Sequence, residues 1–148
     1  MANPSDDAIV PLISSGTAGP LGMLHLPRLW TKLRLSAVGR LPQDYDSCGQ
    51  GFDQMTLDAL GLNRDEVIAY VSSSKPSYVQ FEQWIVQKRG KLEPELLKKH
   101  NAAISGYNHS AELAGSMRKA SGISDASING AVSLNTIEDL DALHHALA

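Results

Sequence analysis

Three basic side chains recur at helical spacing near the start of the chain: His25, Arg28 and Lys32. At positions i, i+3 and i+7 of a helix they form one column. Such a column could bind a small anionic or carbonyl-bearing molecule, and two positive neighbours should keep His25 neutral and able to accept a proton near pH 7. The alternative is a solvated helix face, which is the usual role of a charge column.

A glycine-rich turn, CGQGFD from Cys48 to Asp53, leads into a second expected helix. Its backbone N–H groups could cradle a carboxylate or phosphate, although no Gly-Lys-Ser/Thr follows to make it a P-loop. Asp53 is the candidate acid/base partner of His25, or else it only complements the helix dipole. Cys48 and Gln54 are candidate substrate-binding residues, and the alternative for Cys48 is a small apolar filler.

A second polar group, Tyr107-Asn108-His109, separates two later helices. Tyr107 and His109 complete the catalytic candidates, unless His109 only caps or packs against the next helix. Trp30, beside the basic column, is a further candidate for substrate contact. Asp58 could pair with a cation of the first helix if the first two helices form a hairpin.

Neither a metal nor a cofactor is expected. The sequence contains five histidines and one cysteine, with no His-x-x-x-His or Cys-x-x-Cys pair: His25, His100, His109, His144, His145 and Cys48. A Ser-His-Asp hydrolase has no support from local motifs either, because the Gly-x-Ser-x-Gly elbow and its strands are missing.

Composition favours one globular domain. The chain has 148 residues, 43% hydrophobic and 20% charged, with a net charge of −3. That balance argues against a nucleic-acid-binding surface. No apolar run is long enough to cross a membrane, and the acidic start of the chain lacks the features of a secretory signal. A single cysteine suits a reducing compartment, so a cytoplasmic protein is expected.

Helical periodicity predicts an all-α fold, a compact bundle of six or seven short helices. Residues 1–23 are rich in Pro and Gly and should form an extended N-terminal arm, followed by a single helical domain over 24–148. The apolar residues of the arm should lie across the core or across a partner subunit. Helices are expected at about 26–39, 52–60, 63–73, 77–89, 95–105 and 110–120, and from Asn135 onward.

The segments PLISSGTAGPLG, HLPRLW, CGQGFDQM, ISGYNH and AVSLNTIEDLDALH together span about Pro11 to His144. This pattern resembles a bacterial family of helical proteins of about 150 residues that is catalogued as a domain of unknown function. The resemblance implies a compact single-domain helical protein. It implies no activity, cofactor or site residue.

Three hypotheses follow for function. The preferred one is a small cofactor-free hydrolase, lyase or isomerase, in which His25 and Asp53 exchange protons and Arg28 and Lys32 hold the substrate. The second is a non-catalytic or regulatory module that binds a small anion in the same place. The third is an interaction protein, for instance a homodimer. If the first is correct, Asp53→Asn should leave thermal stability almost unchanged while abolishing turnover.

Overall fold

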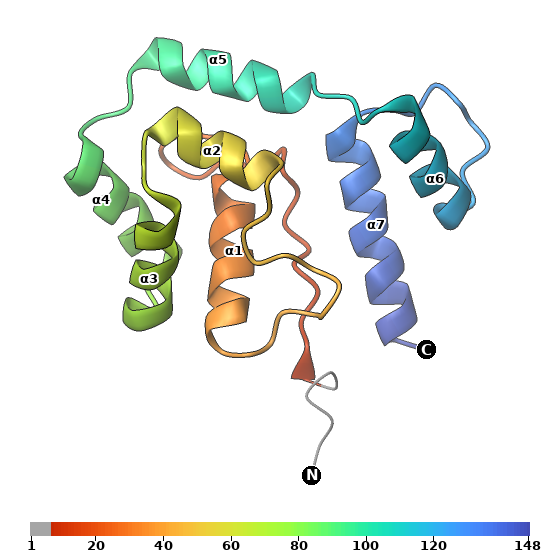
Figure 1. Ribbon diagram of the computed structural model, residues 1–148, viewed down its shortest axis with the longest axis horizontal. Helices are drawn as coiled ribbons and strands as arrows, with labels where there is room; N and C mark the ends of the chain where they lie inside the picture. Colours follow the sequence, from red (N-terminus) through yellow and green to blue (C-terminus); the bar gives the residue numbers. More distant parts are fainter. Residues whose placement is uncertain (1–6) are drawn as a thin grey trace.

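The computed structural model describes residues 7–148 as seven helices joined by turns and loops (Figure 1). They are α1 (Leu26–Ala37), α2 (Phe52–Leu60), α3 (Arg64–Ser74), α4 (Tyr78–Arg89), α5 (Pro94–Ser105), α6 (Ala111–Ser121) and α7 (Ala131–Ala146). Within residues 7–148 there is no strand, only two isolated β-bridges. The predicted all-α fold is confirmed.

Side-chain caps account for three of the seven helix starts, those of α3, α4 and α6. The Asn63 side chain accepts the Glu66 N–H, and Ser77 and Gln80 form a capping box at the start of α4. The last helix differs from the prediction. It begins four residues before Asn135, whose side chain instead accepts a hydrogen bond from His109. The Asn135 side chain, which the sequence pattern predicted to cap this helix, is thus used in a tertiary contact.

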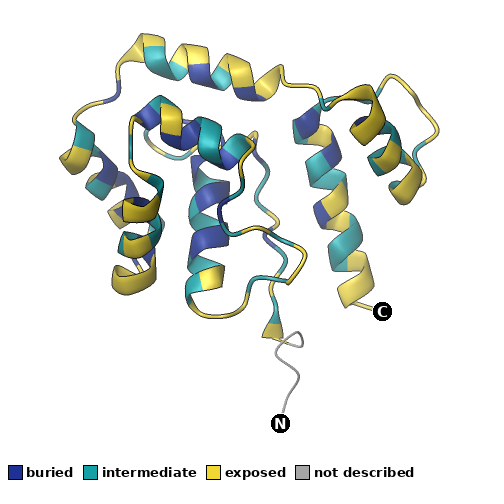
Figure 2. Cartoon of the chain, viewed as in Figure 1, coloured by how far each residue is buried: buried dark blue, intermediate teal, exposed yellow. Residues whose placement is uncertain are grey.

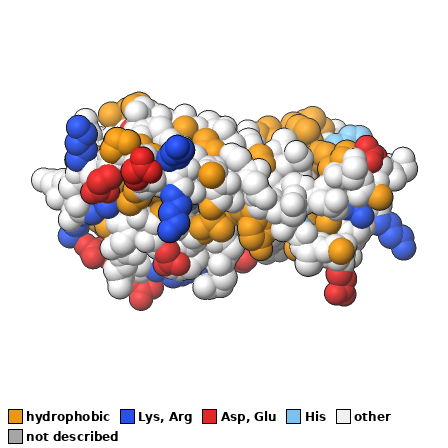
Figure 3. Space-filling view, turned by 90° about the horizontal axis from the view of Figure 1, so that it is seen from above, with side chains coloured by type: hydrophobic (Ala, Val, Ile, Leu, Met, Phe, Trp, Pro, Cys, Tyr) orange, Lys and Arg blue, Asp and Glu red, His pale blue; other side chains and the backbone are white. Residues whose placement is uncertain are grey.

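The main hydrophobic core lies in a body formed by α1 to α5, where α1 packs against α3 and α4. Its largest fully buried side chains include Met23, Leu26, Leu29, Phe81 and Ile85. Helix α5 runs across one end of this body and leads to α6 and α7, which pack against each other on the far side of α1 (Figure 1). Acidic, basic and hydrophobic side chains mix on the face seen from above (Figure 3).

Helix α1 is buried on two sides. Leu26, Leu29 and Leu33 face the core, yet Arg28 and Lys32 are also buried, at 7% and 8% exposure. The dark-blue surface of α1 contrasts with the exposed last turns of α7 (Figure 2). The alternative of a solvated helix face is therefore wrong. A buried cation needs a partner charge, so the surroundings of α1 must supply carboxylates.

The described part of the arm, residues 7–23, forms no α-helix and runs between α1 and α7 (Figure 1). It is bound to the domain at two levels. The Arg28 guanidinium donates to the carbonyls of Pro11 and Ile13, and Met23 is fully buried in the core. The arm thus lies on its own domain, but two of its apolar side chains, Ile9 and Leu12, are 41% and 47% exposed, so the prediction that its apolar residues lie across the core is correct only in part. Residues 1–6 lie outside the described part. No described helix is both long and apolar enough to cross a membrane.

Gly19 makes a close approach to α4 that predicts a stability effect. A Cβ atom there would lie 2.4 Å from Tyr78 Cε2 and 2.8 Å from Glu82 Oε2, and Tyr78 already donates to that oxygen. We expect Gly19→Ala to lower the free energy of unfolding by about 1–3 kcal/mol in urea denaturation. The control is Gly130→Ala, whose added Cβ meets no atom of the described chain within 4 Å. Equal stabilities of the two variants would contradict the prediction.

Candidate functional site

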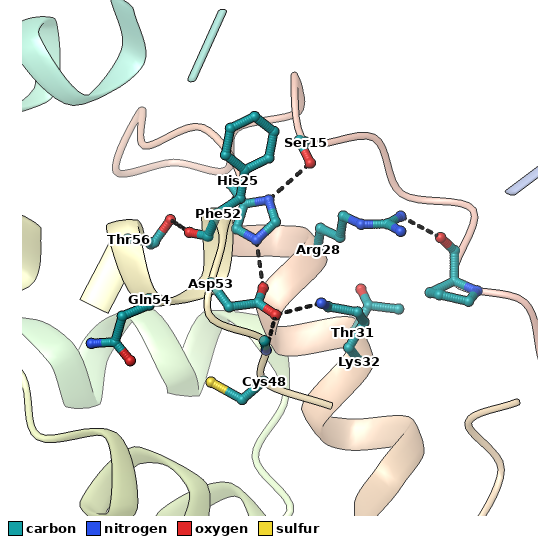
Figure 4. Close-up of polar contacts among 12 residues, drawn as sticks. Ser15, His25, Arg28, Thr31, Lys32, Cys48, Phe52, Asp53, Gln54 and Thr56 are labelled. Carbon is teal, nitrogen blue, oxygen red and sulfur yellow. Dashed lines mark hydrogen bonds and ion pairs between the residues drawn. The ribbon is translucent and has the colours of Figure 1, made fainter. Parts of the chain in front are cut away.

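His25, at the start of α1, uses both ring nitrogens in buried hydrogen bonds (Figure 4). Nε2 lies 2.6 Å from Asp53 Oδ1, and Nδ1 lies 2.9 Å from Ser15 Oγ. Burial lowers the pKa of His25 and outweighs the opposing effect of Asp53. The neutral ring therefore donates from Nε2 to the carboxylate and accepts at Nδ1 from the serine hydroxyl. The neutral state was predicted, but its main cause is burial and not the neighbouring cations.

The backbone of His25 adopts φ 73°, in the left-handed region that non-glycine residues seldom occupy. Such a conformation costs on the order of 1–3 kcal/mol and persists only where the surroundings enforce it. Here the His25 N–H donates to the Thr17 carbonyl, its carbonyl accepts from Leu29, and its ring is held at both nitrogens. The strain marks a position fixed by the tertiary structure.

Asp53 is the centre of the buried network. Its carboxylate accepts from His25, from Lys32 Nζ at 2.5 Å and from the Gly49 N–H at 2.7 Å. Burial by itself would raise the pKa of Asp53, but the hydrogen bond from His25 and the charge of Lys32 lower it to about 2. A carboxylate with so low a pKa is a weak base. Its chemical role here is to orient His25 and to neutralise Lys32.

Arg28 is paired with Asp139 of α7. Its two terminal nitrogens lie 2.6 and 3.1 Å from the two carboxylate oxygens, and Tyr45 donates to Asp139 at 2.8 Å. The same guanidinium also binds the arm carbonyls of Pro11 and Ile13. This cluster joins the arm, α1, α7 and the loop before α2, and it uses most of the hydrogen-bonding capacity of Arg28.

Arg64 holds the glycine-rich turn before α2 in place. It donates to the carbonyls of Cys48 and Gly49 and to the Gln54 side chain. Held in this way, the turn directs the Gly49 N–H at Asp53. The anion that this turn binds is thus a side chain of the protein itself.

A cavity of about 720 Å³ adjoins these groups. Seven of the nine sequence-predicted site residues line it: His25, Arg28, Lys32, Asp53, Gln54, Tyr107 and His109. His25, Arg28, Asp53 and Tyr107 thus line one cavity, which the enzyme hypothesis required and the sequence alone could not show. The catalytic and binding roles of these residues stay predictions. One wall is aromatic, since the Phe52 ring lies 5.5 Å from His25 and 5.6 Å from Tyr107, edge-on in both pairs.

Two predicted substrate contacts lie elsewhere. The Trp30 ring packs against the core and edge-on to Tyr78, and its Nε1–H donates to the Pro76 carbonyl, away from the cavity. Cys48 is 5% exposed within the core cluster, and burial raises the pKa of its thiol. The placement of Trp30 and Cys48 at the site is therefore wrong, because both side chains fill apolar space.

The predicted ion pair of Asp58 is also wrong. Asp58 accepts from the Gln54 side chain at 2.9 Å and points along its own helix. Arg28 and Lys32, the two cations proposed as its partners, are instead paired with the more deeply buried Asp139 and Asp53.

The sequence from residue 14 to residue 141 matches the model of a family described as a domain of unknown function, DUF5069. The chain belongs to this family. The resemblance noted in the sequence is thereby confirmed. The matched DUF5069 region contains Ser15, His25, Asp53 and Asp139, so the side chains of the buried network lie within the family domain. No curated protein matches the sequence closely enough to count as a relative.

Several residues of the DUF5069 site escaped the sequence analysis: Ser15, Tyr45, Asn135, Glu138 and Asp139. They come from the arm, a loop and the last helix, and Asp139 lies 111 positions from its partner Arg28. No local motif connects positions so distant. The hydrogen bonds Ser15–His25–Asp53 follow the order of a hydrolase triad, yet Ser15 is 2% exposed and does not line the cavity.

The buried histidines predict acid sensitivity. Burial lowers the pKa of both His25 and His100 from 6.5, and His100 Nδ1 has no partner among the described residues. The unfolded chain then binds more protons, so the free energy of unfolding should fall as the pH drops below about 6.5, by up to about 1.4 kcal/mol per pH unit for each histidine. A further fall is expected between 3.8 and about 2, where Asp53 titrates.

Urea denaturation at pH 7.5, 6.0 and 5.0 measures this effect. The exposed His145 provides a matched control, since His145→Gln should keep the same pH dependence. A free energy of unfolding that stays constant from pH 7.5 to 5.0 would contradict neutral, buried histidines.

Proposed function

We propose that this DUF5069 domain binds a small molecule in the cavity and that Lys32 donates hydrogen bonds to an oxygen atom of that molecule. The supporting observation is that the Lys32 ammonium group is buried beside the cavity and yet makes a single hydrogen bond within residues 7–148. It is 8% exposed, lines the cavity and donates one hydrogen bond, to Asp53. An ammonium group has three N–H donors, so two are left over among the described residues. Unused donors at a buried charge favour an acceptor brought by a ligand.

Arg28 contributes little to this proposal, because Asp139 and the arm carbonyls already bind its guanidinium. Lys32 alone, and not the whole basic column, is therefore the proposed anion-binding group. A carbonyl or carboxylate oxygen at Lys32, with the body of the ligand against Phe52 and Tyr107, suits the cavity.

A second candidate is the cofactor-free enzyme. It is favoured by the continuous hydrogen bonds from Ser15 through His25 to Asp53 beside the cavity. In this arrangement the only basic atom of His25 is Nδ1, so a proton can reach it only from the Ser15 hydroxyl. Ser15 is 2% exposed, and therefore binding without chemistry is the better supported function.

Binding is tested by filling the cavity. Leu113 lines it and is 47% exposed, so Leu113→Trp should block the cavity without disturbing the core. We expect at least one compound of a small-metabolite library to raise the melting temperature of the wild type. At about 100 times its Kd, a ligand adds about 2.7 kcal/mol to the free energy of unfolding, which corresponds to several degrees. The shift should vanish in Leu113→Trp.

The control is Val79→Trp, a substitution at a 54% exposed side chain away from the cavity, which should keep the full shift. A library without any stabilising compound, or an equal shift in Leu113→Trp, would refute the proposal. Turnover of a bound compound that is lost in Ser15→Ala would favour the enzyme instead.

A further inference from the structure

Carboxylates predominate in the lining of the cavity. Five of them face two permanent cations there: Asp44, Asp46, Asp53, Asp58 and Glu138 against Arg28 and Lys32. Acidic and basic side chains mix on the one outer face that Figure 3 shows.

Both cations of the lining are neutralised inside the protein, Arg28 by Asp139 and Lys32 by Asp53. Four exposed carboxylates remain, which we call the acidic rim: Asp44, Asp46, Asp58 and Glu138. None of the ion pairs in the described chain involves a residue of this rim. The opening of the cavity therefore carries net negative charge, while the charges in its buried part neutralise one another.

Glu138 lies next to the buried Asp139 carboxylate. Partial burial and, to a smaller extent, Asp139 raise the pKa of its side chain, while Arg28 and His109 act in the opposite direction. A cation at the rim would relieve the repulsion between carboxylates. The nearby Phe52 and Tyr107 rings could also contact a cation through their faces or an alkyl chain through their edges.

The geometry does not favour a metal ion as this cation. In residues 7–148 no three His, Cys, Asp or Glu side chains gather closely enough to hold one. An organic cation needs no such convergence, because an amine or guanidinium can bind one or two separate carboxylates.

We propose that the ligand has two ends, an oxygen acceptor that binds Lys32 in the buried part of the cavity and an amine or guanidinium group that lies at the acidic rim. Two independent observations meet in this proposal: the unused donors of the nine-tenths buried Lys32 and the unpaired carboxylates at the opening. It rests on the proposed binding function and adds the chemical class of the ligand, an amino acid or another amino-carbonyl compound.

A matched series of probes tests the ligand class. Straight-chain ω-amino acids of two to six carbons are compared with the alkylamines and the carboxylates of the same lengths, by NMR titration of the cavity amides of Gly49, Gly51 and Tyr107. We expect one ω-amino acid to bind at least about tenfold tighter than the carboxylate of its length, with weaker binding at higher salt. Mg²⁺ serves as the metal control and should cause no saturable shift.

The rim is tested by the double variant Asp46→Asn, Glu138→Gln, which should reduce the preference for the amine about tenfold. Both side chains are exposed, so the melting temperature should stay nearly constant. Asp65→Asn is the matched control, an exposed carboxylate on α3 away from the cavity, and should keep the full preference.

The outcomes separate this inference from the function on which it rests. If carboxylates or uncharged compounds bind as tightly as amines and Leu113→Trp still blocks them, the two-ended ligand is refuted while the binding function stands. Saturable binding of Mg²⁺ in place of amines also overturns the inference. If neither this series nor the wider library shifts the cavity amides, both proposals fail.

Discussion

Replacing Asp139 by asparagine is expected to lower the free energy of unfolding by about 3–5 kcal/mol, the usual cost of removing one partner from a buried ion pair. The side chains of Arg28 and Asp139 are 9% and 4% exposed, so without the carboxylate the guanidinium keeps the Pro11 and Ile13 carbonyls as partners but loses its counter-charge. The same substitution weakens the hydrogen bond from Tyr45 and breaks the connection that Arg28 makes between the arm and α7. Urea denaturation at pH 7.5 measures the loss.

The chain offers an exposed ion pair as a control. Lys88 and Glu66 lie on the surface, with side chains 46% and 49% exposed, so Glu66→Gln should cost no more than about 1 kcal/mol. Replacing both buried partners, Arg28→Met with Asp139→Leu, should restore part of the lost stability, because no uncompensated charge is left. A loss in Asp139→Asn as small as that in Glu66→Gln would contradict the account.

Asp53→Asn is expected to be as damaging, with a loss of about 3–5 kcal/mol and a fall in melting temperature on the order of 10 °C. The neutral amide removes the charge that compensates Lys32 and offers one acceptor oxygen in place of two, although His25, Lys32 and Gly49 all donate to this side chain. The sequence hypothesis of a catalytic Asp53 predicted almost no change in stability. The buried network predicts the opposite.

A paired substitution isolates the cause. Lys32→Met with Asp53→Leu removes both charges and should be more stable than Asp53→Asn alone, but it should not bind the ligand, because the donor is gone. Thermal unfolding measures the stability of these variants, and the NMR titration described above measures their ligand binding. If Asp53→Asn melts within a degree or two of the wild type, the network is not structural and the acid/base hypothesis regains support.

These expectations divide the site into two parts with different tasks. The buried part, from Ser15 to Asp139, fixes the arm, α1, α2 and α7 relative to one another. The cavity beside it presents groups that the fold leaves unused, namely two donors of Lys32 and the carboxylates of the acidic rim. A ligand is therefore expected to meet a preformed site.

Much of the fold could be predicted because its signals are local. Asn63 and Ser77 cap their helices through residues three positions away, and Gly61 ends α2 in the left-handed conformation. The site candidates were identified by residue type and spacing on one helix, and seven of the nine reached the cavity. Trp30 and Cys48 did not, since an aromatic ring or a thiol is equally suited to a core and to a site.

The all-α class, most of the helices and the column of His25, Arg28 and Lys32 follow from the sequence alone, because they depend on neighbours within one or two turns. The burial of this column and the carboxylate that pairs with each of its cations follow only from the packing of the helices. Asp53 and Asp139 lie 21 and 111 positions from their partners, and nothing in their local surroundings distinguishes them from solvated acids. The pairing of each cation with its carboxylate depends on which helices pack together. Once the cations are buried, they need a partner of opposite charge.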